Sequence, residues 1–343
     1  MDLSTNYLGL RLRSPFIVGA SPFCDNSAIA RKLQDNGAGA VVMRSLFAEQ
    51  LQPLPPAPGG DGYSAPPYPD IAEYQLSPKR YLQQLERLKR RLSIPVIASL
   101  NGHQPGAWTD FAQCLEQAGA DAIELNFYQV VTDPSVAADQ IETEMLETVG
   151  AIAGSVGIPV AVKLSPFHAS VAQLGIALEL EGAAGLVVFN RFYQPEVDAD
   201  TLEVMPALHL SDPGELLLRL RWLAILAPLL RGSLAASGGI HSADDAAKAL
   251  LTGAHAVQVV SILLQKGPDA LALLGLGLER WMRQHDFSAI SQFRGELDLA
   301  SCPDPAAFER ANYIRVLQSW PAGAPGLPRS QAKPEFHAAG ARR

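Results

Sequence analysis

Short apolar, β-branched segments recur along the chain, and each is followed by a longer segment with apolar residues at helical spacing. The short segments are almost continuously apolar, which is typical of strands buried on both faces of a parallel sheet. Eight are present, at residues 16–20, 40–43, 95–100, 121–125, 159–164, 185–189, 233–236 and 256–260. We therefore predict eight buried strands.

The intervening segments predict helices, several with Asp, Ser or Asn near the start and Gly near the end. They span residues 26–36, 78–92, 106–118, 138–155, 169–182, 213–230, 242–252 and 267–284. This alternation of strand and helix indicates an α/β protein with a closed (β/α)8 TIM barrel. The alternative, an open doubly wound sheet, is expected to carry a G-x-G-x-x-G motif after an early strand, and no such motif follows one here.

Three segments lie outside the repeat. Residues 1–14 alternate in polarity and predict a hairpin that plugs the bottom of the barrel. Residues 51–75 are rich in Pro, Gly and aromatics and follow the second strand, so we predict a lid over the site, with a plain surface loop as the alternative. Residues 321–343 predict a disordered tail, which makes residues 1–320 a single domain.

The composition narrows the possible functions. Hydrophobic residues make up 48% of the chain and charged residues 18%, which favours a large core over disorder. The net charge of -8 disfavours a nucleic-acid partner, because phosphate backbones are repelled. The basic run Lys89, Arg90 and Arg91 is interpreted as the solvated face of a helix.

The cysteines and the apolar stretches indicate the compartment. Cys24, Cys114 and Cys302 are widely spaced and form no CxxC motif, so we expect a reduced cytoplasmic protein without disulfides or a metal site. The first residues lack a basic start followed by an apolar run, and no apolar stretch is long enough to span a bilayer. We therefore expect neither a signal peptide nor a membrane partner.

Polar residues follow the predicted strands at the end where such barrels carry their chemistry. Helix capping accounts for Asn101 and Ser261, but not for Lys163, a cation inside the apolar run VAVKLSPF. A buried lysine is costly without an anionic partner. We predict that Lys163 faces a ligand, with an ion pair to Glu124 on the adjacent strand as the alternative.

The last two strands predict a phosphate site. Ser237 is followed by Gly238 and Gly239, which let the backbone approach a ligand closely and turn N–H groups toward it. The eighth strand ends at Val260 and Ser261, and the loops after strands 7 and 8 form the usual phosphate site of these barrels. A tight turn is the alternative interpretation of the two glycines.

A ring with a phosphate tail suits this layout. Asn126 and Asn190 are placed to bind the edge of a heterocycle, and Lys163 to stabilise negative charge that develops on a flavin near its N1 and O2 atoms. These features fit a flavin with a phosphate tail, and the family resemblance given below implies FMN. Pyridoxal phosphate is the alternative and requires Lys163 to form a Schiff base.

The sequence resembles the dihydroorotate dehydrogenase family of FMN barrels, and most closely a bacterial dihydroorotate dehydrogenase-like branch. The resemblance covers nearly the whole chain before the tail, through the segments YLGLRLRSPFIVGASP, VVMRS, ADAIELN, VAVKLSPF, LVVFN, AASGGI, GAHAVQVVSILLQKGP and ISQFRGEL. It implies that Ala20, Ser21 and Ser45 line the flavin, that Asn126 and Asn190 touch flavin or substrate, and that Lys163 contacts the isoalloxazine. It also implies that Gly238, Gly239, Val260 and Ser261 hold the phosphate through backbone N–H groups.

The sequence departs from the family where the substrate is expected. Gln129 stands where the family has a Cys or Ser base, and an amide cannot act as a base. The following proline and asparagine of the family are Val130 and Val131, and its substrate-binding lysine is Arg44. No counterpart of the asparagine-rich substrate stretch is found in 51–75. The sequence thus matches the family at the residues expected to bind flavin and differs from it at most of those expected to bind dihydroorotate.

Several groups remain candidates for moving the substrate proton. Tyr128 and Asp133 lie in the loop of Gln129, and His103 and His168 follow neighbouring strands. Tyr128 is predicted to donate a proton, with packing against the lid as the alternative.

We predict an FMN-dependent oxidoreductase acting on a CH–CH bond of a small substrate. Its substrate is formally dihydroorotate, and another small acid or enone is equally compatible. Arg44 and Arg191 are predicted to clamp a substrate carboxylate. The alternative is a flavoprotein that serves as an electron-transfer or regulatory partner. Dihydrouridine synthesis on tRNA is disfavoured by the acidic charge. We further expect a homodimer and a separate redox partner protein.

Overall fold

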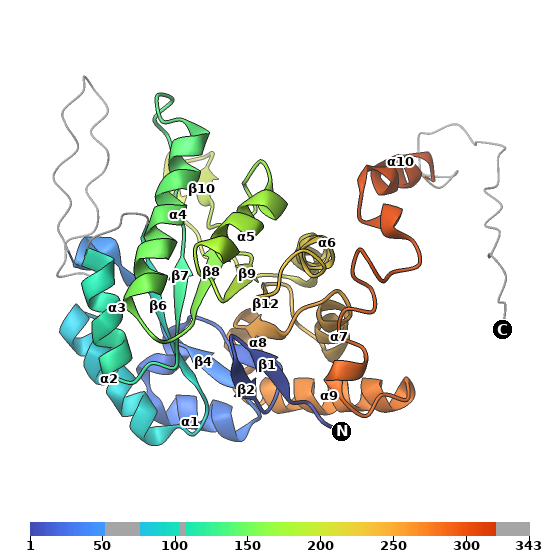
Figure 1. The fold of residues 1–343 in the computed structure, drawn as a ribbon, viewed down its shortest axis with the longest axis horizontal. Coiled ribbons are helices and arrows are strands. Elements are labelled where there is room, and N and C mark those ends of the chain that lie inside the picture. Colours follow the sequence, from blue (N-terminus) through green and yellow to red (C-terminus); the bar gives the residue numbers. More distant parts are fainter. Residues whose placement is uncertain (52–75, 103–106, 320–343) are drawn as a thin grey trace.

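The computed structural model describes residues 1–51, 76–102 and 107–319, which form a ring of parallel strands surrounded by helices (Figure 1). The strands are β3 (Phe16–Val18), β4 (Ala40–Val42), β6 (Val96–Asn101), β7 (Ala122–Asn126), β8 (Val160–Leu164), β9 (Gly185–Val188), β12 (Ser233–Ser237) and β13 (Ala256–Val259). Each pairs with its neighbour, and the pairings β13–β3 and β4–β6 close the ring. The predicted (β/α)8 barrel is confirmed.

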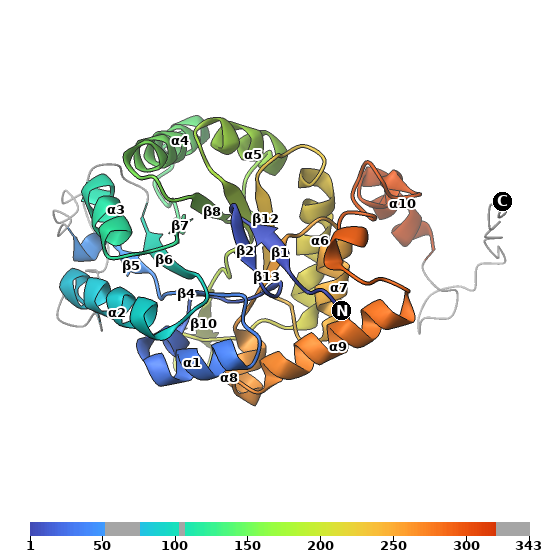
Figure 2. The same ribbon diagram turned by 60° about the horizontal axis from the view of Figure 1, so that its bottom comes forward.

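The helices that connect the strands form the outer layer (Figure 2). They are α1 (Ser27–Asp35), α2 (Pro78–Arg91), α3 (Ala107–Gln117), α4 (Ala138–Ser155), α5 (Val171–Leu180), α6 (Leu216–Leu226), α7 (Ala243–Leu251), α8 (Ser261–Lys266) and α9 (Ala270–Gln284). The predicted helix positions agree to within a few residues. The last predicted helix is preceded by the short α8, and Gly267 lies between α8 and α9 with φ +81°.

Sequence periodicity missed the shorter elements. The strand β5 (Leu46–Phe47) adds to β6, and β10 (Pro195–Asp198) pairs with β11 (Glu203–Pro206) in an exposed hairpin. The helix α10 (Arg310–Gln318) stands off from the barrel (Figure 1) and has no buried residue. Strands of two to four residues are too short to show a pattern, and α10 buries no apolar face that would mark it as a core helix.

The N-terminal hairpin closes the bottom of the barrel, as predicted. Its strands β1 (Thr5–Tyr7) and β2 (Leu10–Leu12) pair antiparallel and lie over the centre of the ring in Figure 2. Small side chains line the barrel interior at this level, and this leaves room for the hairpin. They include Ala40, Ala122, Ala161, Ala235 and Ala256. Tyr7, Leu8 and Leu12 fill the space and are buried. We call this packed level the lower layer.

A polar layer lies directly above it. Side chains two residues apart on a strand point the same way, so the alanines Ala122, Ala161 and Ala256 are followed on the interior by Glu124, Lys163 and Gln258. Ser99 of β6 pairs in register with Glu124 and belongs to the same level. All four side chains are buried. We call Ser99, Glu124, Lys163 and Gln258 the polar layer.

Some predictions concern parts of the chain that are not described. Apart from Leu51, the predicted lid at 51–75 falls there, as do the predicted tail at 321–343 and His103. Within the described residues, all three cysteines are free, no helix is long and apolar enough to cross a membrane, and no cluster of three or more His, Cys, Asp or Glu side chains is placed to hold a metal ion.

Candidate functional site

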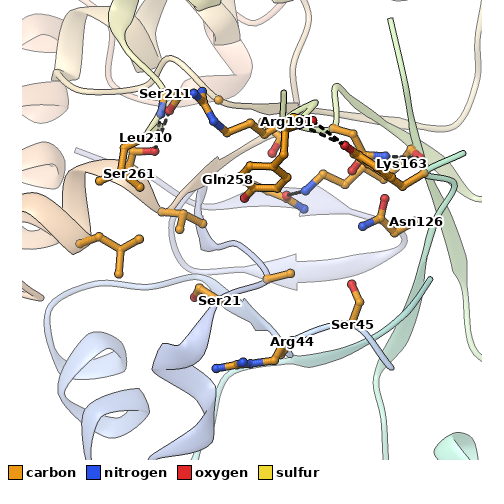
Figure 3. A pocket seen from close by; sticks show the side chains of 18 of the residues that line it. Ser21, Arg44, Ser45, Asn126, Lys163, Arg191, Leu210, Ser211, Gln258 and Ser261 are labelled. Carbon is orange, nitrogen blue, oxygen red and sulfur yellow. Dashed lines mark hydrogen bonds between the residues drawn. The ribbon is translucent and has the colours of Figure 1, made fainter. Parts of the chain in front are cut away.

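One cavity of about 550 Å³ opens at the carboxyl ends of the barrel strands, directly above the polar layer (Figure 3). Its walls include every residue that the sequence suggested for cofactor or substrate: Ala20, Ser21, Arg44, Ser45, Asn126, Tyr128, Lys163, Asn190, Arg191, Ser237, Gly238, Gly239, Val260 and Ser261. These residues come from seven of the eight strand ends, β6 being represented by Asn101. Closure of the barrel therefore brings them together.

Lys163 is held by Gln258, which also lines the cavity, and by Glu124, which does not. Its Nζ donates to Gln258 Oε1 at 2.9 Å and lies 3.7 Å from Glu124 Oε1. Gln258 Nε2 in turn donates to Glu124 Oε2. Gln258 thus connects the cation to the carboxylate, and both alternatives considered for Lys163 are met: it pairs with Glu124 and it lines the cavity.

Two asparagines border the same part of the cavity. Asn190 is buried, and its Nδ2 donates to Phe127 O at 3.0 Å and to Lys163 O at 3.3 Å, which fixes the side chain against two strand ends. Asn126 Oδ1 is buried and accepts no hydrogen bond from any described residue. A buried acceptor without a donor is costly, so Asn126 is suited to accept a hydrogen bond from a ligand.

The glycine end of the cavity is built from Ser237, Gly238 and Gly239, with Ser211 and Ser261 beside them. Gly238 and Gly239 have φ values of +92° and +82°, a conformation that favours glycine. A Cβ on Gly239 would lie 2.5 Å from Leu216 N, so the backbone of α6 leaves it no space. Ser261 Oγ accepts hydrogen bonds from Ser211 N at 3.0 Å and is 2.8 Å from Ser211 Oγ.

Both arginines of the cavity are paired with carboxylates of the chain. Arg44 Nη2 donates to Asp25 Oδ2 at 2.5 Å, and Arg191 Nη1 donates to Glu215 Oε1. Arg191 Nε is buried and has no acceptor among the described residues. The predicted carboxylate clamp therefore requires each arginine to bind substrate beside, or in exchange for, its present partner.

Tyr128 is the candidate proton-transfer residue that lines the cavity. Its hydroxyl accepts from Tyr193 N at 3.1 Å and donates to Tyr193 O at 3.2 Å, and its ring stacks on Phe192 at 4.8 Å. Asp133 lies in an exposed turn, where hydrogen bonds from Ser135 lower the pKa of its carboxyl group. The described side chains thus favour Tyr128 over Asp133.

His168 is a second candidate that the structure places elsewhere. Its Nδ1 lies 3.9 Å from Glu142 of α4, and the residue is absent from the cavity lining. Burial lowers the pKa of His168, an effect opposed by Glu142. His168 therefore faces Glu142 of the outer layer rather than the cavity.

Much of the barrel matches a known protein family. Residues 76–282, more than half of its length, match the family profile described as dihydroorotate dehydrogenase. The chain belongs to the dihydroorotate dehydrogenase family. It is an oxidoreductase that acts on CH–CH donors, as the dehydrogenases of this family do.

Relatives of known name extend this result beyond the matched residues. The chain is 26% identical over 325 residues to dihydropyrimidine dehydrogenase (NADP(+)), chloroplastic, of Arabidopsis thaliana, covering 86% of this chain and 76% of that protein. It is 28% identical over 314 residues to the catalytic subunit of dihydroorotate dehydrogenase B (NAD(+)) of Methanosarcina acetivorans, covering 84% and 94%. It is 26% identical over 317 residues to the NAD-dependent dihydropyrimidine dehydrogenase subunit PreA of Escherichia coli K12, covering 86% and 76%.

Sequence reasoning missed several groups at the site of this family member. Gln258 carries the signal that singled out Lys163, because it is a polar side chain inside an apolar strand. Arg219 and Glu215 carry no such signal, since acid and base four residues apart are common on helices. Leu210 and Ser211 come from the loop before α6, whose approach to the cavity depends on the tertiary fold.

Proposed function

We propose that this chain binds FMN in the barrel cavity and uses it to transfer hydride to or from a CH–CH bond of a small cyclic substrate. The observation that carries the proposal is the extent of the cavity. It joins the cation Lys163 and the unpaired acceptor of Asn126 on one side to the glycine backbone and Ser261 on the other (Figure 3). A ring with a phosphate-bearing chain matches both ends.

The residues present suit the two ends of FMN. At the ring end, Asn126 Oδ1 lacks a donor and Lys163 supplies positive charge. At the phosphate end, the backbone of Gly238 and Gly239 lines the cavity, and their positive φ values favour glycine at both positions. A volume of about 550 Å³ lies within the usual range for cofactor sites.

Bound FMN would supply the hydride acceptor or donor of the reaction. The chain contributes electrostatics, since Lys163 is fixed in position by Gln258 and Glu124 and can stabilise negative charge on the ring without reorganising. The same pairing argues against pyridoxal phosphate, because a Schiff base would remove two of the protons with which Lys163 holds its partners.

The substrate is proposed to be a dihydropyrimidine-like ring rather than dihydroorotate itself. Gln129 stands at the family's base position and does not line the cavity, whereas Tyr128 of the same loop does. Tyr128 would exchange a proton with the substrate by releasing Tyr193 O, to which it now donates. The relatives named dihydropyrimidine dehydrogenase support this class of substrate.

The loop that carries Gln129 also favours a second function, electron transfer. Because Gln129 cannot act as a base, the chain could bind flavin without oxidising any pyrimidine and pass electrons to or from a separate protein. The relatives named as subunits support a separate redox partner. We also propose a homodimer and a cytoplasmic location, and residues 1–320 as one domain.

The test is an anaerobic titration of the purified protein. Flavin should co-purify, its phosphate should identify it as FMN, and dihydrouracil should bleach its visible band faster than dihydroorotate. Lys163→Met should slow bleaching about 100- to 1,000-fold, whereas Lys248→Met, which removes an exposed lysine of α7, should not slow it. Absence of bound flavin overturns the proposal. Flavin that stays oxidised with both substrates, and is reduced only by a partner protein or NADH, supports the electron-transfer function.

A further inference from the structure

Arg219 of α6 lies behind the glycine end of the cavity. Its side chain is 6% exposed, and it is not part of the cavity wall. Its Nε donates to Ser237 O at 3.0 Å, and a Cβ on Gly238 would lie 3.1 Å from its Nη2. The guanidinium therefore supports the loop that the ligand would touch, on the side away from the ligand.

Arg219 shares one carboxylate with Arg191. Glu215 Oε2 is 3.4 Å from Arg219 Nη2, and Glu215 Oε1 accepts from Arg191 Nη1. Arg219 Nη1 also donates to Glu215 O at 2.8 Å, which anchors the start of α6. The three side chains form a row from the end of β9 to the end of β12.

The row carries a surplus positive charge. Arg44 is paired with Asp25 and Lys163 with Glu124, so those pairs are neutral. Arg191 and Arg219 have Glu215 between them, so these three side chains together carry one positive charge, and Arg219 lies beside Gly238. The pKa of Arg219 is lowered chiefly by burial, with Glu215 opposing and Arg191 adding to the effect. A guanidinium stays charged even so, because its ordinary pKa is far above neutrality.

We propose that Arg219 is a specificity-determining residue, through which the cavity selects a phosphorylated flavin over an unphosphorylated one. This inference rests on the proposed FMN site. The surplus cation acts across the glycine backbone on the phosphate group. It does not act on the isoalloxazine ring, which FMN and riboflavin share. Because the Arg219 side chain is buried, its charge is weakly screened by solvent.

The experiment measures selection between the two flavins by the full-length holoenzyme. Protein is equilibrated with known mixtures of FMN and riboflavin, and the bound flavins are identified by chromatography. Damage that affects both flavins equally cancels in this ratio. Arg219→Met should reduce the preference for FMN about tenfold, and Arg219→Lys should leave it within about threefold, because the charge remains.

Glu215→Gln provides the opposite test. It removes the negative charge of the row and keeps the shape of the side chain, so the preference for FMN should rise by about threefold or more. If Arg219→Met does not fold, Glu215→Gln and Arg219→Lys still decide the question. An unchanged ratio in Glu215→Gln, or an equal loss of both flavins in Arg219→Met, overturns the inference. Failure of the unaltered protein to hold either flavin would instead overturn the proposed function.

Discussion

The lower layer and the polar layer of the barrel interior differ sharply although the same strands build both. In the lower layer, alanines of β7, β8 and β13 surround Tyr7, Leu8 and Leu12 of the N-terminal hairpin. Two residues farther along, the same strands carry Glu124, Lys163 and Gln258. The interior is thus filled by apolar side chains at one level and by a buried ion pair at the next.

The difference shows how the barrel divides stability from function. Apolar burial in the lower layer stabilises the fold directly. A buried ion pair is weak support for stability, because desolvation opposes the attraction between its charges. Such a pair at the floor of a cavity is better explained by what it presents to a ligand. Variants of the two layers should separate stability from function.

Removing the cation of the polar layer, Lys163, should have the largest effect on stability and on turnover. Lys163→Met leaves Glu124 as a buried charge, and the free energy of unfolding should fall by about 3–5 kcal/mol. Turnover should fall about 100- to 1,000-fold, as when a preorganised charge is lost from an active site. Urea titration and steady-state kinetics measure the two effects.

The double variant Lys163→Met with Glu124→Gln is the matched control. It removes both charges, so most of the stability should return while turnover stays low. If the double variant is as unstable as the single one, the unpaired carboxylate is not the cause. If turnover returns with stability, Lys163 has no role beyond packing.

In the lower layer, Tyr7 should behave as a packing residue. Tyr7→Ala should lower the free energy of unfolding by about 3–5 kcal/mol, because it leaves a cavity among well-packed side chains. Tyr7→Phe should change it by less than about 1 kcal/mol, since Tyr7 Oη is buried without a partner in the described part of the chain. A large loss in Tyr7→Phe, in chemical denaturation, would reveal a polar function for the lower layer.

His255, which directly precedes β13, should make stability depend on pH. Burial, with Arg294 adding to it, lowers the pKa of His255 to about 4. Its Nδ1 accepts from Leu234 N at 3.1 Å, and its Nε2 lies 2.7 Å from Arg294 Nη1. As the pH falls below about 6.5, His255 binds a proton in the unfolded chain but not in the folded one. The contribution of His255 to stability is therefore fully present above about pH 6.5 and is lost as the pH drops toward the pKa of the folded state.

Between about pH 7 and about pH 5 the loss assigned to His255 should be about 2 kcal/mol. It is measured as the difference between the unaltered protein and His255→Gln, whose side chain does not titrate. Equal pH dependence in the two proteins would show that the ring is not held neutral.

The glycine end offers the most specific change. Gly239 and Gly9 both have positive φ, +82° and +76°, so an alanine at either costs about 1–2 kcal/mol of backbone strain. A Cβ on Gly239 would meet Leu216 N, whereas one on Gly9 meets nothing within 4 Å. Gly239→Ala should therefore also weaken flavin binding, and Gly9→Ala should not. Equal flavin affinities in the two variants, by fluorescence titration, would contradict a ligand-binding role for this loop.

Most of the fold was predictable because local patterns of apolar and polar residues determine its strands and helices. Apolar continuity marks a buried strand, helical spacing marks a helix, and their alternation implies a barrel. The same reading singled out Lys163, since a cation in an apolar run needs a partner. It also located the cavity, because the carboxyl ends of parallel strands meet on one face of a barrel.

The sequence by itself thus determined the barrel, its plug and the strand ends that surround the cavity. Only the tertiary structure decided which polar groups meet there. Gln258 reaches Lys163 across 95 residues and Glu124 across 134, between strands that are not neighbours in the sheet. Such contacts cross the barrel interior and depend on the register of every strand between them. Arg219 shows the same limit, since nothing near it in sequence reveals that its guanidinium supports Gly238. Local patterns specify elements, whereas the register and closure of the barrel specify which charges face one another.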